Sequence, residues 1–290
     1  MLSRKTRLRR NKQTRRRATV LTRQLSLNVI GLVVVAVIIF PIYWTAAVAL
    51  QNDAEPLITA PNLLPLHLTL SNFIIAWRTI GGGVVVSLIV SFAVVVLGLI
   101  IGVPAAYALR RFQLRSVGIV IGLLLVTQMV PSISLSIAFY TVFDELHLLN
   151  SYVGLVLADS TYAVPLMVLL LRAFLESLPA EIMDAGRVDG CNDGRLLWLI
   201  VLPISLPGVV TASVFGFLGA WGDFLFGLTL NSGGNVQPLT VQLYKFVGTY
   251  TTNWGPLMAA VVLAAIPAGV VLSFAQGSIR SGLRAGSLKG

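Results

Sequence analysis

The segment from Leu178 to Pro207 holds the residue types best suited to chemistry, and its glycines, prolines and acids suit contact with a moving partner. Pro179 fits the first position of a helix. Gly190 is placed to end that helix in the left-handed conformation, after which Asn192 or Asp193 can cap the next one. The spacing predicts a short helix, a glycine elbow and a second helix that continues past the segment.

One face of the predicted short helix offers little bulk. Leu178, Ile182 and Ala185 are spaced to share that face, and Ala185 and Gly186 have almost no side chain. A partner could therefore approach the backbone closely. Acidic residues flank the face and could meet basic groups on the partner: Glu181, Asp184 and Asp189. Spacing alone fits an ordinary solvated loop between two membrane helices equally well.

The elements that must position this segment are membrane helices. Hydrophobic residues make up 56% of the 290 residues and charged residues 11%, against roughly 25% charged in soluble domains. A bilayer core about 30 Å thick needs about 20 apolar residues in a row. The runs of this length lie at 25–50, 84–109, 117–143, 152–174, 204–230 and 257–275. We expect an all-α membrane protein with about six transmembrane helices.

The basic residues predict the orientation of these helices. Ten of the 21 Lys and Arg residues lie in positions 1–24 without an acid, so the high net charge belongs to one arm and does not indicate nucleic-acid binding. All but Arg78 and Lys245 fall on one side of the predicted spans, which places both termini in the cytoplasm. We expect a basic cytoplasmic arm at 1–24, which rests on anionic membrane lipid. A permease domain at 25–276 follows, with its coupling segment at 177–203, and the chain ends in a cytoplasmic tail at 277–290.

Three of the polar residues inside the apolar runs are candidates for a solute path. A carboxylate exposed to lipid costs about 2.5–3.5 kcal/mol on insertion scales, so Asp223 should face protein or water. A role in a solute path or its gate is one reading, and a polar contact with a neighbouring subunit is the other. Gln128 is a second candidate for the path, and Asp159 a weaker one.

Glycine pairs and prolines recur in the runs. Gly98 and Gly102, like Gly118 and Gly122, have the spacing that allows close helix contact. Four prolines are expected to interrupt their helices: Pro104, Pro131, Pro165 and Pro267.

The short-helix segment resembles the EAA motif of ABC importer permeases. The match is carried by Asp184-Ala185-Gly186, Gly190, Ile200 and Leu202-Pro203. In that family the segment is the coupling helix, which sits in a cleft of the ATP-hydrolysing subunit. This chain departs from the motif with Asp184 in place of Glu and Gly186 in place of the second Ala.

Other stretches are similar to the carbohydrate branch of the same family. They are Phe40–Trp44, Pro104–Phe112, Trp221–Phe224 and the ending Gly282–Gly290, which resembles the tail of the maltose-type second permease. The resemblance implies a bacterial plasma-membrane subunit that works with a second permease, two ATP-binding subunits, an extracytoplasmic solute-binding protein and a carbohydrate solute.

The chain itself contains no Gly-x-x-x-x-Gly-Lys-Ser/Thr phosphate loop. We therefore expect ATP and Mg²⁺ to be bound by the partner ATPase and not by this chain. We also expect no cofactor, metal or catalytic site in it. The alternatives are an ion-coupled secondary transporter, a non-transporting membrane scaffold, and an ABC permease for a non-sugar solute such as a polyamine.

Overall fold

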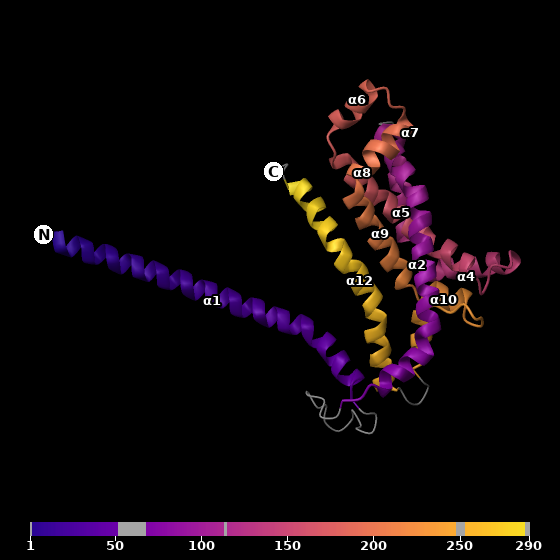
Figure 1. Ribbon diagram of the computed structural model, residues 1–290, viewed down its shortest axis with the longest axis horizontal. Helices are drawn as coiled ribbons and strands as arrows, with labels where there is room; N and C mark the ends of the chain where they lie inside the picture. Colours follow the sequence, from indigo (N-terminus) through magenta and orange to yellow (C-terminus); the bar gives the residue numbers. More distant parts are fainter. Residues whose placement is uncertain (1, 52–67, 113–114, 248–252, 288–290) are drawn as a thin grey trace.

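Helices make up the regular structure of the chain. The structure, a computed structural model, describes residues 2–51, 68–112, 115–247 and 253–287 (Figure 1). Its helices are α1 (Leu2–Ala49), α2 (Ser71–Arg111), α3 (Arg115–Met129), α4 (Ser132–Glu145), α5 (Tyr152–Ser177), α6 (Ala180–Val188), α7 (Asp193–Arg195), the π-helical η1 (Leu196–Val201), α8 (Leu202–Ile204), α9 (Leu206–Trp221), α10 (Leu225–Leu230), α11 (Leu239–Tyr244) and α12 (Trp254–Ser287). The predicted all-α class is confirmed.

Four of the described helices are long and apolar enough to cross a membrane. They are Leu27–Ala49 of α1, α2, α5 and Trp254–Gly277 of α12. Two bent pairs also qualify, each as one broken span: Val117–Met129 with Ser132–Glu145, bent by 90°, and Asp193–Ile204 with Leu206–Trp221, bent by 80°. Counting each pair once gives six spans, in agreement with the number expected.

The structure corrects the details of the predicted runs. The second span begins at Ser71 rather than Val84, because helical geometry continues through the more polar turns before the apolar run. Of the four prolines, only Pro131 breaks its helix. The other three lie inside continuous helices: Pro104 in α2, Pro165 in α5 and Pro267 in α12.

Helix α1 is attached to the bundle at its C-terminal end and extends away from it (Figure 1). Ala49 packs in a core cluster with Ala259 and Ala260 of α12. Beside it, the buried amide of Asn72 donates to the carbonyl oxygens of Ala49 and Gln51, at 3.1 and 2.7 Å. The predicted basic arm forms the first part of α1, but its side chains lie outside the described ones.

The centre of the bundle is a contact of α2, α5 and α9 at small residues. The side chain of Met167 in α5 is fully buried. An added Cβ would lie 2.4 Å from its sulfur at Gly98 of α2 and 2.7 Å at Gly216 of α9. Gly98 therefore serves close packing, as its spacing predicts, whereas a Cβ added at Gly102 would make an ordinary contact with Leu171 at 3.4 Å. Gly118 and Gly122 do not serve close packing, because no atom lies within 4 Å of a Cβ added there.

Replacing Gly98 by leucine is expected to lower the stability of the bundle by about 1–3 kcal/mol, since the new side chain has to displace Met167. Gly122→Leu is the matched control in an open position. Thermal denaturation of the detergent-purified protein should show a lower midpoint for Gly98→Leu alone. Equal midpoints for the two variants would contradict this packing.

Candidate functional site

Helix α6 ends in a glycine elbow. Gly190 has φ +78°, in the left-handed region that favours glycine. The N–H of Gly190 donates to the oxygen of Arg187, and the N–H of Cys191 to the oxygen of Gly186, both at 3.0 Å. These two bonds form a Schellman motif, which satisfies the last carbonyls of α6. The predicted left-handed end at Gly190 is confirmed.

The helix after the elbow is capped by Asn192. Its side-chain oxygen accepts a hydrogen bond from the backbone N–H of Arg195 at 2.8 Å. Asp193, the other cap that the sequence allowed, instead accepts from Tyr107 at 3.2 Å and from Arg111 at 3.3 Å. These bonds tie the elbow to the end of α2. At the other end, Pro179 precedes α6 as its N-cap rather than occupying its first turn.

The inner face of α6 is made by Met183 and Gly186. Both are buried, and a Cβ added to Gly186 would lie 2.6 Å from Leu196 and 2.9 Å from Ile200. Gly186 therefore admits the π-helical segment η1 and is not open to a partner. The expectation that a partner could approach the backbone at both Ala185 and Gly186 was therefore wrong for Gly186, whereas Ala185 is exposed.

The outer face of α6 is exposed and mixes charge with an apolar residue. Its members are Glu181, Asp184, Ala185 and Val188. Val188 is 87% exposed and was missed by the sequence reasoning, although its position three residues after Ala185 could have placed it there. Asp184 pairs with Arg187 at 3.2 Å, and Asp189 is exposed beside the elbow.

The remaining residues of the motif continue from the elbow toward the membrane. Ile200 and Leu202 are half-buried and pack against the core cluster that contains Met183. Pro203 is exposed in the one-turn helix α8. The chain then bends by 80° at Ser205, before α9. The segment thus forms an unbroken physical link from α6 to the fifth span.

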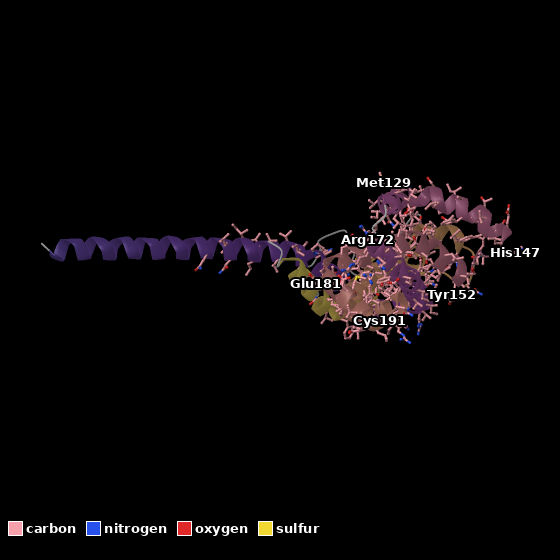
Figure 2. The ribbon with its side chains drawn as sticks, turned by 90° about the horizontal axis from the view of Figure 1, so that it is seen from above. Met129, His147, Tyr152, Arg172, Glu181 and Cys191 are labelled. Atoms are coloured by element: carbon pink, nitrogen blue, oxygen red, sulfur yellow. The ribbon has the colours of Figure 1, made fainter. Side chains whose placement is uncertain are left out.

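Seen from the α6 end, the labelled Arg172, Glu181 and Cys191 lie over the bundle, whereas His147 projects at its edge (Figure 2). The segment from α6 to α7 therefore lies at one end of the spans. Figure 1 shows α6 and α7 at that same end, opposite the start of α2.

A second candidate site is a cavity of about 410 Å³ among the spans, called here the central cavity. Asp223 and Gln128, both expected near a solute path, line it together with Asp159. The aromatic residues Tyr162 and Phe226 also line it. The structure thus brings together three polar residues that are distant in the sequence.

Asp223 holds the break between α9 and α10. Its carboxylate accepts hydrogen bonds from the backbone N–H of Phe226 at 3.3 Å and of Gly227 at 3.0 Å. Its own carbonyl accepts from the hydroxyl of Thr240. These bonds satisfy backbone groups freed by the break, which is how a membrane protein tolerates irregular backbone beside a cavity. Asp223 therefore faces protein, as expected from the free-energy cost of exposing a carboxylate to lipid.

Hydrogen bonds also connect α5 to the break between α3 and α4, on the lining of the central cavity. Gln128 donates to the carbonyl of Tyr162 at 2.9 Å, and the Tyr162 hydroxyl donates to the carbonyl of Val130 at 2.6 Å. Asp159 is only 7% exposed. Among the residues that line the cavity, the charged ones are both acidic, Asp159 and Asp223.

Comparison with known proteins gives consistent matches along most of the chain. Residues 98–285 match the family described as "Binding-protein-dependent transport system inner membrane component". The diacetylchitobiose uptake system permease protein DasC of Streptomyces coelicolor is 32% identical over 91% of this chain and 96% of its own length. The sulfoquinovosyl glycerol transport system permease protein SmoH of Agrobacterium fabrum is 30% identical over 87% of this chain and 89% of its own length.

The fold has a solved counterpart. A chain of a bacterial ABC transporter involved in the import of the acidic polysaccharide alginate superposes with a TM-score of 0.73. The superposition covers 87% of this chain and 95% of that one, at 20% sequence identity. The family match spans well over half of the chain, so this multi-pass protein belongs to the binding-protein-dependent transport system inner membrane components, the permease subunits of ABC importers.

Proposed function

We propose that the chain is a permease subunit of an ATP-driven carbohydrate importer and couples ATP hydrolysis to solute movement through α6. The observation that carries this proposal is the exposed outer face of α6, held outside the spans by the Gly190 elbow. Glu181 and Asp184 would meet basic groups of an ATPase subunit. Ala185 and Val188 would let its surface approach closely.

Movement of α6 would reach the membrane through its inner face. Met183 and Gly186 pack against η1, which continues through α8 into α9. Closure of two partner ATPase subunits around ATP and Mg²⁺ would shift this packed unit and bias the bundle between two arrangements. In this scheme Pro203 and the bend at Ser205 pass the shift into the fifth span.

The chemistry of the central cavity supports a carbohydrate as the solute. The carboxylates of Asp159 and Asp223 can accept hydrogen bonds from hydroxyl groups, and the amide of Gln128 can both donate and accept them. The rings of Tyr162 and Phe226 offer apolar faces against which a sugar ring can pack. Relatives named for diacetylchitobiose and trehalose uptake, 32% and 27% identical, point to the same class of solute.

The remaining subunits follow from this assignment. A second permease would complete the solute path, and an extracytoplasmic binding protein would deliver the solute. The distribution of charge supports a cytoplasmic location of both termini and α6. Arg110 lies in the last turn of α2, Arg172 near the end of α5 and Arg195 in α7, all toward α6, whereas Arg78 lies near the start of α2. Lys245 follows α11, whose Gln242 accepts a hydrogen bond from the N–H of Gly83 in the first half of α2.

Replacing Ala185 by tryptophan is expected to prevent docking of the ATPase subunits, because the bulk falls on the outer face of α6 and leaves its inner packing intact. Co-purification from native membrane should recover about tenfold less ATPase, as loss of a well-packed interface contact commonly costs over 1 kcal/mol. Gly233→Trp, in open space on an exposed loop, is the control. Normal ATPase recovery with Ala185→Trp would overturn the role of α6.

Replacing Asp223 by asparagine is expected to raise the solute concentration for half-maximal uptake by about tenfold, since a hydrogen bond to a charged group is lost. Asparagine can still accept from a backbone N–H, so the start of α10 is retained. ATP-driven uptake into proteoliposomes of the whole transporter is the measurement, with the exposed Asp144→Asn as control. Unchanged affinity and rate would remove Asp223 from the path, and uptake driven by an ion gradient without ATP would overturn the importer assignment.

A further inference from the structure

A larger cavity of about 760 Å³ lies at the α6 end of the spans and is called here the basic cavity. It opens among the end of α2, the start of α3, the end of α5 and α6. Its volume is in the range of roughly 300–1,000 Å³ typical of small-molecule sites. Its charged lining consists of four basic and two acidic residues: Arg110, Arg111, Arg172, Arg187, Glu176 and Asp184.

The arginine side chains of the basic cavity are not all neutralised. Arg172 pairs with Glu176, Arg187 with Asp184, and Arg111 with Asp193. Arg110 forms no ion pair with any residue that the structure describes. The cavity therefore carries an excess of positive charge, centred on Arg110.

Two guanidinium nitrogens of the basic cavity are also left without a partner among the described residues. Arg110 donates through Nη2 to the carbonyl of Leu178 at 2.8 Å, but its buried Nη1 has no acceptor. The buried Nε of Arg172 has none either. Unsatisfied buried donors of this kind are costly and indicate an acceptor supplied from outside the chain. A phosphate group is one of the anions that an arginine fork binds through two parallel hydrogen bonds.

The apolar part of the lining indicates where such a phosphate comes from. Leu109, Val117 and Leu178 line the same cavity as the arginines. Arg110 lies in the last turn of α2, and Arg172 within the last two turns of α5, both of which are membrane spans. A cavity at the end of spans whose lining combines arginines with apolar side chains matches a phospholipid, whose charged headgroup adjoins hydrocarbon.

We propose that the basic cavity binds the phosphate of an anionic phospholipid headgroup, with Arg110 as its principal ligand. Arg172 offers a second donor through its buried Nε, and the ion pairs of Arg172 and Arg187 offset the acidic side chains of the cavity. Since Arg110 also holds the carbonyl of Leu178, two residues before α6 begins, the bound headgroup and the base of α6 share one guanidinium. Occupancy of the cavity should therefore steady α6. This site does not depend on which solute the transporter carries.

Hydrogen–deuterium exchange of α6 tests the proposal at the site itself. The full chain, purified with the subunits that accompany it, is placed in nanodiscs of phosphatidylcholine alone or mixed with phosphatidylglycerol. Phosphatidylglycerol should slow exchange of the amides of Ala180–Val188. In Arg110→Gln, about fivefold more phosphatidylglycerol should be needed for the same protection. Reading α6 alone separates this effect from lipid binding by the basic arm.

Two further variants guard against a merely structural effect. Arg187→Gln leaves the bond between Arg110 and Leu178 in place, and it should also weaken the protection by phosphatidylglycerol. Arg195→Gln removes one exposed cation from α7, outside the cavity, and should behave as the unmodified chain. Equal lipid dependence in Arg110→Gln, Arg187→Gln and Arg195→Gln would overturn the site.

Other sources of anionic charge give distinct results. Inorganic phosphate added to phosphatidylcholine nanodiscs should have no effect, and full protection by it would assign the cavity to a soluble phosphate compound. Protection of α6 that requires the ATPase subunits and ignores phosphatidylglycerol would assign the cavity to an acidic group of that subunit. Either outcome would overturn the lipid assignment and leave the proposed transport function standing.

Discussion

Backbone groups inside a bilayer find no water, so every departure from a continuous helix needs a hydrogen-bond partner from the chain itself. This constraint explains why polar side chains gather at the two breaks. Tyr162 satisfies the carbonyl of Val130 beside the proline break, and Asp223 satisfies the first N–H groups of α10. The breaks open the central cavity, and the residues that stabilise them also line it. Structural support and the proposed contact with solute are therefore properties of the same side chains.

The two sites are connected through one stretch of chain. It starts at the Gly190 elbow, passes through η1 and α8, bends at Ser205 and ends at Asp223, where α9 gives way to α10. Both ends are held by side chains, since Asn192 caps the start and Asp223 the break. Between them the stretch is packed rather than loose, because Leu196 and Val201 are buried in the same cluster as Met167. A displacement at α6 thus meets a packed element, which transmits movement better than a flexible loop does.

Much of this arrangement could be predicted from the sequence. The six spans follow from the length of the hydrophobic runs. The elbow follows from Gly190, because a helix that ends with a residue in the left-handed conformation favours glycine at that position. The burial of Gly186 could not be predicted, because it depends on how η1 packs against α6, and a π-helical turn has no clear local pattern. The inward meeting of Gln128 and Asp223 likewise depends on the directions of two sharp bends. Hydropathy gives the length of a span but not its straightness.

The attachment of α1 has a mechanical consequence. The buried Asn72 is hydrogen-bonded to the C-terminal end of α1. This helix has 48 residues and is therefore about 70 Å long at 1.5 Å per residue. Between Leu27 and Ile42 the described side chains of α1 are exposed. If α1 tilts by about ten degrees at the end bound by Asn72, its N-terminal end moves by about 12 Å. A small change of angle at the attached C-terminal end is therefore amplified along the length of the helix.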